Sequence, residues 1–143
     1  MNKTAIIYWS GTGNTAAMAE AIAEGAKSVN PDAALFGISD ITADDAASYD
    51  NLALGCPAMD AEVLEEGEFE PFFTELEGKI TGKNIALFGS YGWGDGEWMR
   101  SWQARVTAAG ATLVGGEGLT ANDMPDDAAL EQCRELGMTL AAM

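Results

Sequence analysis

The sequence predicts a single three-layer α/β domain, residues 1–143, in which a five-stranded parallel sheet is covered by helices on both faces. Three observations support this fold class. Strand-like and helix-like segments alternate about five times along 143 residues, a length that suits one domain. The strand-like segments are short apolar runs without clean alternation, as in parallel strands buried on both faces. No linker, low-complexity tract or further repeat interrupts this order.

The first half of the chain predicts three strands and two helical segments. Lys3–Trp9 is a mostly apolar run and predicts the first strand. Asn14–Ser28 carries apolar or small residues at helical spacing, and the Asn-Pro-Asp triplet after it ends the helix. A short strand at Ala33–Ile38, a helical turn at Asp44–Tyr49 and a third strand at Asn51–Gly55 are then expected.

The second half continues the alternation with two strands and three helices. Glu68–Gly78 places its phenylalanines on one side of a helix, and Asn84–Phe88 predicts the fourth strand. Glu97–Ala109 predicts a helix because a glycine suited to its C-terminal cap follows it. Thr112–Leu119 predicts a fifth strand interrupted by two glycines, and Asp126–Ala142, after a proline, is the last helix.

Composition excludes several classes of function. The chain has no histidine, and its two cysteines, Cys56 and Cys133, lie far apart in the sequence. A zinc or iron–sulfur site and a Ser-His or Cys-His catalytic pair are therefore not expected. Both cysteines are expected to be small buried or half-buried side chains. The formal charge of −16 disfavours nucleic acid and anionic membranes and favours basic protein partners.

The acidity is concentrated in one segment. Eight carboxylates and no basic residue lie between Asp60 and Glu77, which indicates either a solvated helical face or a docking surface. No apolar run approaches the length of a membrane span, and the first residues lead directly into a strand. We therefore expect a cytoplasmic protein without a signal peptide.

Three loops follow strands at the edge where parallel sheets bind ligands: residues 10–15, 56–62 and 89–96. The first admits three interpretations. It satisfies the dinucleotide pattern G-x-G-x-x-[GA], although the chain is short for a complete dinucleotide-binding fold. It lacks the lysine of a Walker loop. As a site for one phosphate monoester, it combines backbone N–H groups at a helix start with polar side chains, namely Ser10, Thr12, Asn14 and Thr15.

The other two loops carry candidates for binding a planar ring. Trp93 lies between glycines, which favours stacking on a ligand over anchoring the core. Met59 is a polarizable side chain that suits the opposite face of such a ring. Glu62 is suited to accept a hydrogen bond from a ring N–H. Packing in the core or on a helix face is expected for the other tryptophans, Trp9, Trp98 and Trp102.

Three motifs, in this order, resemble those of flavodoxins, most closely the short-chain type of anaerobic bacteria such as clostridia. The motifs are Ser10-Gly11-Thr12-Gly13-Asn14-Thr15, the run Glu62-Val63-Leu64-Glu65-Glu66 with Phe69-Glu70-Pro71-Phe72, and Phe88-Gly89-Ser90-Tyr91-Gly92-Trp93-Gly94-Asp95-Gly96. The resemblance spans nearly the whole chain. It implies a doubly wound, flavodoxin-like sheet with strand order 2-1-3-4-5 and noncovalently bound FMN as the cofactor.

The resemblance also assigns contacts to FMN. It assigns the 5′-phosphate to Ser10–Thr15 and places the isoalloxazine between Trp93 and Met59. Glu62 is assigned to the pyrimidine edge, and Asn122 to the sugar-like chain or the ring edge. The full set of expected FMN-binding residues is Ser10, Gly11, Thr12, Gly13, Asn14, Thr15, Pro57, Ala58, Met59, Asp60, Ala61, Glu62, Ser90, Tyr91, Gly92, Trp93, Gly94, Asp95 and Asn122. Catalytic and metal-binding residues are not expected.

The resemblance implies a monomeric, low-potential one-electron carrier rather than an enzyme with its own substrate. Such a carrier shuttles between flavin semiquinone and hydroquinone and substitutes for ferredoxin. Its expected partners are ferredoxin-dependent redox enzymes, such as 2-oxoacid oxidoreductases and hydrogenases, which would contact the acidic segment Asp60–Glu77. The alternatives are a flavin-dependent reductase on the same fold, a nicotinamide-nucleotide-binding domain and a response-regulator-type module. A response-regulator-type module needs an acidic cluster at the end of the first strand, where this chain has Trp9-Ser10.

Two residues depart from the pattern of short-chain relatives within one turn. Asp60 stands where these relatives usually have glycine, and Pro57 where they often have serine. Pro57 lacks the hydroxyl that serine offers to the phosphate. Glycine lowers the cost of the peptide rotation by which a carbonyl of this turn accepts a hydrogen bond from the half-reduced flavin. Asp60 is therefore expected to restrict that rotation and to add a carboxylate near the ring.

We predict that Asp60→Gly increases the yield of the flavin radical, because the glycine removes the steric restriction on the turn. Redox titration of the FMN-loaded wild type and variant, followed by absorbance, measures the yield. Equal yields in the two proteins would contradict the prediction.

Overall fold

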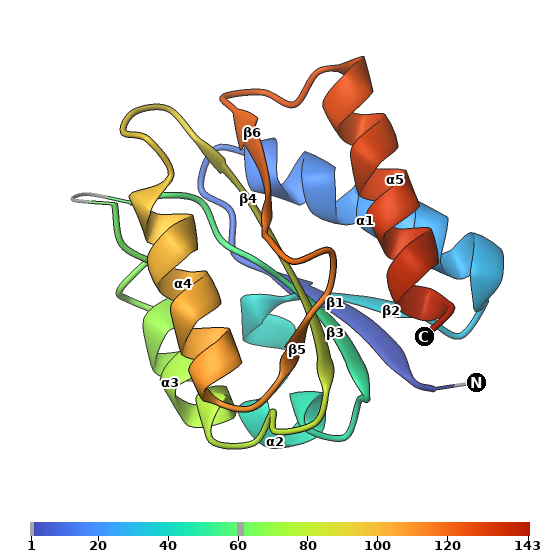
Figure 1. Ribbon diagram of the computed structural model, residues 1–143. Helices are drawn as coiled ribbons and strands as arrows, with labels where there is room; N and C mark the ends of the chain where they lie inside the picture. Colours follow the sequence, from blue (N-terminus) through green and yellow to red (C-terminus); the bar gives the residue numbers. More distant parts are fainter. Residues whose placement is uncertain (1, 60–61) are drawn as a thin grey trace.

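The computed structural model describes residues 2–59 and 62–143 (Figure 1). Asp60 and Ala61, two of the expected FMN contacts, lie outside the described residues. The centre of the molecule is a parallel sheet in the order β2-β1-β3-β4-β5, with β6 also paired to β4. The strands are β1 (Thr4–Tyr8), β2 (Ala34–Gly37), β3 (Asn51–Gly55), β4 (Asn84–Tyr91), β5 (Thr112–Leu113) and β6 (Leu119–Asn122). The predicted fold class and strand order are confirmed.

The fifth position of the sheet is shared by two short strands instead of one interrupted strand. β5 pairs with the start of β4, and β6 pairs with its end, from Phe88↔Leu119 to Tyr91↔Asn122. Between them Gly115 and Gly116 both have a φ of 80°, a left-handed conformation that cannot continue a strand. This turn lets the chain rejoin β4 further along, so that Asn122 comes to lie beside Tyr91 at the carboxyl end of the sheet.

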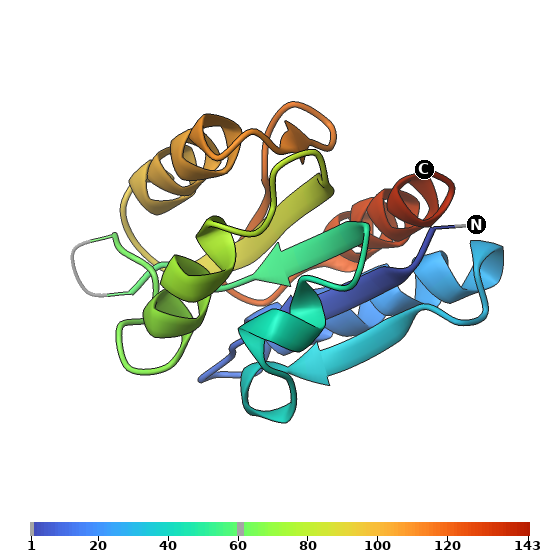
Figure 2. The ribbon, with the colours of Figure 1, turned by 90° about the horizontal axis from the view of Figure 1, so that it is seen from below.

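Helices cover both faces of the sheet, as predicted (Figure 1, Figure 2). One layer holds α1 (Asn14–Val29) and α5 (Asp127–Ala141), and the other holds α2 (Ala43–Ala46), α3 (Phe69–Glu77) and α4 (Glu97–Ala108). A short 3-10 turn, Ile38–Asp40, follows β2. The four long helices begin and end within one residue of the predicted bounds. No helix among the described residues is long and apolar enough to cross a membrane.

Each central strand contributes to two cores, which explains the apolar residues at its middle positions. In β1, Ile6 packs in the cluster under α1 and α5, whereas Ala5 and Ile7 pack in the cluster under α3 and α4. Successive side chains of a strand point to opposite faces, so a strand covered on both sides needs apolar residues at every position. Cys56 and Cys133 are buried, as expected, and burial raises the pKa of the two thiols to about 12 and about 11.

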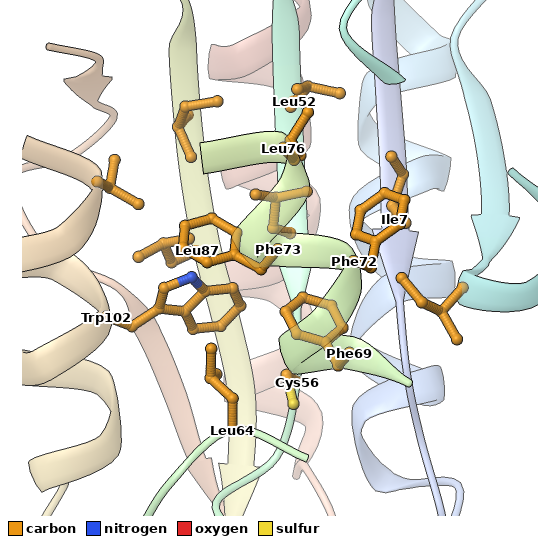
Figure 3. Packing of buried hydrophobic residues seen from close by; sticks show 14 of the residues in the cluster. Ile7, Leu52, Cys56, Leu64, Phe69, Phe72, Phe73, Leu76, Leu87 and Trp102 are labelled. Atoms are coloured by element: carbon orange, nitrogen blue, oxygen red, sulfur yellow. The ribbon is translucent and has the colours of Figure 1, made fainter. Parts of the chain in front are cut away.

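Aromatic rings fill the space between α3 and α4 (Figure 3). Trp102 meets the rings of Phe69 and Phe73 edge to face, with centroid distances of 5.3 and 5.9 Å. Trp98 and Trp102 are both about 1% exposed, which confirms the expectation that they pack on the helix face. Trp9 is only half-buried, and it lies at the ligand-binding edge described below.

Most carboxylates of the acidic segment have structural partners. Arg105 of α4 pairs with Glu70 and Glu77 of α3 at 2.7 and 3.0 Å and so joins the two helices. Glu65 accepts hydrogen bonds from the backbone N–H groups of residues 67, 68 and 69, at 2.7–2.9 Å, just before and at the start of α3. The segment is therefore more than a solvated helical face.

The hydrogen bonds to Glu65 make its charged form part of the fold. Partial burial acts to raise the pKa of this carboxyl, but the backbone N–H groups of Phe69, Glu68 and Gly67 outweigh that effect and hold it below its usual value. A lowered pKa in the folded state stabilises the protein above the unfolded pKa, about 4.3. That contribution is lost as the pH falls through the folded pKa.

We predict that Glu65→Gln lowers the free energy of unfolding at pH 7 by about 1 kcal/mol. The difference from wild type should shrink as the pH is lowered below about 4, because the wild-type carboxylate then becomes protonated and is neutral like the amide of the variant. Urea unfolding at a series of pH values measures both effects. The control is Glu66→Gln, because the neighbouring Glu66 is exposed and has no hydrogen bond or ion pair to the described residues. A Glu65 effect that did not vary with pH would contradict the assignment.

Candidate functional site

A cavity of about 300 Å³ lies at the carboxyl ends of β1, β3 and β4, where all three loops singled out from the sequence meet. Figure 1 shows the loops after β1, β4 and β6 at this end of the sheet. The lining residues are Trp9, Gly11, Thr12, Asn14, Pro57, Ala58, Met59, Ser90, Tyr91, Gly92, Trp93 and Asp123. The volume and the mostly apolar and aromatic lining are those of a small-molecule site.

One side of the cavity is formed by the start of α1. The helix begins at Asn14 after Gly13, whose φ of 96° makes a left-handed turn. The N-cap residue, Gly13, makes no side-chain capping bond, and the first turn holds no acidic residue. Ser10 Oγ and Thr12 Oγ1 instead accept bonds from the N–H groups of Gly13 and Asn14, at 3.1 and 3.4 Å, and so shape the loop. An uncapped helix N-terminus at a cavity is suited to an anion.

Thr15 does not line this cavity with its side chain. It is about 1% exposed, and its Oγ1 accepts a hydrogen bond from the Ser90 N–H at 3.3 Å. Thr15 Oγ1 also lies 3.4 Å from Ser90 Oγ. The hydroxyl predicted to contact a phosphate therefore ties α1 to the end of β4, and the assignment of Thr15 to the phosphate stays a prediction.

The two side chains expected to cover a planar ring both line the cavity. Trp93 is 53% exposed, although large aromatic side chains are usually buried. Met59 is half-buried, and its backbone pairs with Val63 through two hydrogen bonds of 2.9 Å. This pairing fixes the backbone of Met59 at the cavity.

The side chain of Glu62 is engaged with the backbone at the start of α4. Its Oε1 accepts hydrogen bonds from the backbone N–H groups of Gly96 and Glu97, each at 3.0 Å, and so caps the start of α4. Gly94 has a φ of 79°, and a Cβ there would overlap the Glu62 carboxylate. Both the left-handed backbone and the lack of space therefore require glycine at this position. Glu62 is absent from the lining of the cavity among the described residues, and its contact with a ring N–H stays a prediction.

Five other expected contacts among the described residues are not in the lining of the cavity, namely Ser10, Gly13, Gly94, Asp95 and Asn122. Asn122 ends β6, where its side-chain amide donates to the carbonyl of Tyr91 at 3.3 Å. Asp95 pairs with Arg100 at 2.9 Å on the surface. Ser10 and Gly13 are joined by a hydrogen bond within the loop that precedes α1.

Two lining residues were missed by reasoning from the sequence. Trp9 follows β1 directly, and its indole N–H donates to Glu68 at 3.2 Å; its place between the first strand and the polar loop was the available signal. Asp123 adjoins Asn122 and has a left-handed φ of 55°. Nothing local marked it, because only the pairing of β6 with β4 brings it to the cavity.

The family model for flavodoxins matches residues 6–137 of this chain. The chain belongs to the flavodoxin family. It is 49% identical to the flavodoxin of Megasphaera elsdenii over 136 residues, which cover 95% of this chain and 96% of that one. It is 48% identical to the flavodoxin of Clostridium beijerinckii, covering 95% and 97% of the two chains.

Solved flavodoxin structures superpose closely on this one. The solution structure of two-electron reduced Megasphaera elsdenii flavodoxin gives a TM-score of 0.86 at 48% identity, covering 98% of this chain and 99% of that chain. A flavodoxin from the domain Archaea gives 0.86 at 30% identity, covering 97% and 96%. This flavodoxin-family chain is accordingly an electron-transfer protein of a flavin-binding family.

Proposed function

We propose that this flavodoxin-family chain binds FMN in the cavity at the carboxyl ends of β1, β3 and β4. The observation that carries the proposal is the uncapped N-terminus of α1 beside an apolar cavity that exposes Trp93. The residues present fit the cofactor. Residues 10–15 would hold its phosphate, and Trp93 and Met59 would cover its ring. FMN supplies the chemistry of accepting and releasing single electrons.

The charges around the cavity support a carrier of low potential. Among the described lining residues none is cationic, and Asp123 is acidic. The chain as a whole carries a formal charge of −16. Negative charge added to a ring in this cavity is therefore opposed by the phosphate, by Asp123 and by the acidic surface, and the opposition is strongest where water is excluded. We infer that the protein works in place of ferredoxin as a cytoplasmic monomer and has no substrate of its own.

The expected colour and ligand selectivity test the cofactor. Purified protein should be yellow and should release FMN on acid treatment, and the flavin-free protein should rebind FMN. Riboflavin, which lacks the phosphate, should bind much more weakly because it cannot use the start of α1. Fluorescence titration measures both affinities, with NADH as the control ligand. A colourless protein that binds NADH and refuses FMN would overturn the proposal, as would equal affinities for FMN and riboflavin.

The carboxylates of the acidic segment are of two kinds. Within the acidic segment Glu62, Glu65, Glu68, Glu70 and Glu77 accept hydrogen bonds or pair with Arg105. Glu66 and Glu75 are exposed and have no hydrogen bond or ion pair to the described residues. Carboxylates without internal partners are the ones free to attract a basic surface. We propose that Glu66 and Glu75 attract ferredoxin-dependent enzymes to the surface of the acidic segment.

We predict that electron transfer to a 2-oxoacid oxidoreductase slows as salt is raised, because ions screen the attraction between exposed charges. The double variant Glu66→Gln/Glu75→Gln should weaken the salt dependence. Glu20→Gln is the control, since the exposed Glu20 lies on α1 in the opposite helical layer. Stopped-flow rates at several ionic strengths measure the effect. The same salt dependence in the double variant and the control would refute the proposed surface.

A further inference from the structure

The hydrogen-bond ladder between β3 and β4 opens directly behind the cavity. Below the opening the strands are regular, and the N–H of Cys56 donates to the carbonyl of Phe88 at 3.1 Å. Above it the N–H of Ala58 donates to the carbonyl of Ser90 at 3.1 Å. A regular parallel ladder would place one more bond between these two, from the Ser90 N–H to the Cys56 carbonyl. Within residues 2–59 and 62–143 this bond is not formed.

Both freed backbone groups have side-chain partners, one from each helical layer. The Ser90 N–H donates to Thr15 Oγ1 of α1 at 3.3 Å. The Cys56 carbonyl accepts a hydrogen bond from the indole Nε1–H of Trp98, in the first turn of α4, at 3.0 Å. Cys56 is fully buried and Ser90 is 5% exposed, so either group would be costly to leave without a partner.

Trp98 therefore contacts both walls of the cavity from behind. Through the Cys56 carbonyl it holds the point where β3 becomes the loop of Pro57, Ala58 and Met59. On the other side its ring lies 5.7 Å from that of Tyr91, which lines the cavity. The helix that carries Trp98 is itself capped by Glu62.

Trp102 offers a direct comparison on the same helix. It is equally buried, about 1% exposed. Its rings contact Phe69 and Phe73 in the core between α3 and α4 (Figure 3). Its indole nitrogen has no hydrogen-bond partner among the described residues. Both tryptophans thus fill the core, but only Trp98 connects the core to the backbone of the cavity.

We propose that Trp98 is a positioning residue for the flavin. By donating to the Cys56 carbonyl, it fixes the backbone at the end of β3, from which Pro57, Ala58 and Met59 enter the lining of the cavity. The inference rests on the proposed binding of FMN in this cavity. It assigns a positioning role to a residue that is not in the lining of the cavity.

Trp98→Phe and Trp102→Phe form the matched pair that tests the proposal. Each variant removes one indole and leaves a phenyl ring, so both should lower the stability measured by urea unfolding. Only Trp98→Phe leaves the Cys56 carbonyl without its donor. It should raise the FMN dissociation constant about fivefold or more, and Trp102→Phe should change it by less than about twofold.

Amide hydrogen exchange in the flavin-free proteins gives a readout independent of FMN. The Ala58 N–H should exchange faster in Trp98→Phe than in wild type, because its bond to Ser90 lies next to the opened ladder. In Trp102→Phe it should exchange as in wild type. Equal changes in the two variants, in either the dissociation constant or the Ala58 exchange, would overturn the role of Trp98. A wild-type protein that does not bind FMN would instead overturn the proposed function.

If Trp98→Phe does not fold, the wild type alone decides the question. The Nε1–H resonance of Trp98 should shift and become more protected when FMN binds, and that of Trp102 should not. No change at Trp98, or the same change at both indoles, would overturn the proposal.

Discussion

The parallel pairing of β1, β3 and β4 is the constraint on which the rest of the structure depends. Because helices cover both faces, the middle positions of these strands carry apolar side chains, and polar and glycine residues gather at the strand ends and in the loops. Parallel strands also end at one edge. The loops after Tyr8, Gly55 and Tyr91 therefore meet there together with the start of α1, and the cavity is a consequence of strand direction.

The walls of that cavity are held by side chains from both helical layers. Where the β3–β4 ladder opens, Thr15 takes the freed N–H and Trp98 the freed carbonyl. Buried backbone groups must be paired, so the opening obliges α1 and α4 to lie where they do. In turn Glu62 caps α4 and fixes the loop that carries Trp93. The ligand site and the helix packing are thus parts of one hydrogen-bonded arrangement.

Electrostatics give the acidic segment two kinds of carboxylate. Glu65, Glu70 and Glu77 stabilise the fold through backbone N–H groups or Arg105, whereas Glu66 and Glu75 extend from the surface. These hydrogen bonds and ion pairs make the first kind costly to remove, whereas the exposed second kind can attract a charged partner at a distance. Although the molecule is strongly acidic, the positive end of the helix dipole still favours binding of an anion at the N-terminus of α1.

The sequence by itself determined the elements, the fold class and the three loops of the site, because these depend on local patterns. Helical spacing placed the four long helices within one residue, and the glycines around Trp93 marked an aromatic side chain that lines the cavity. Only the tertiary structure decided how those residues are used. It placed the Thr15 hydroxyl to accept a hydrogen bond from Ser90, 75 positions away, and the Glu62 carboxylate to accept one from Gly96, 34 positions away. It also split the fifth strand, which brought Asp123 to the cavity. The reason is physical: hydrogen bonds between distant segments depend on where strands end and ladders open, and no local periodicity encodes that.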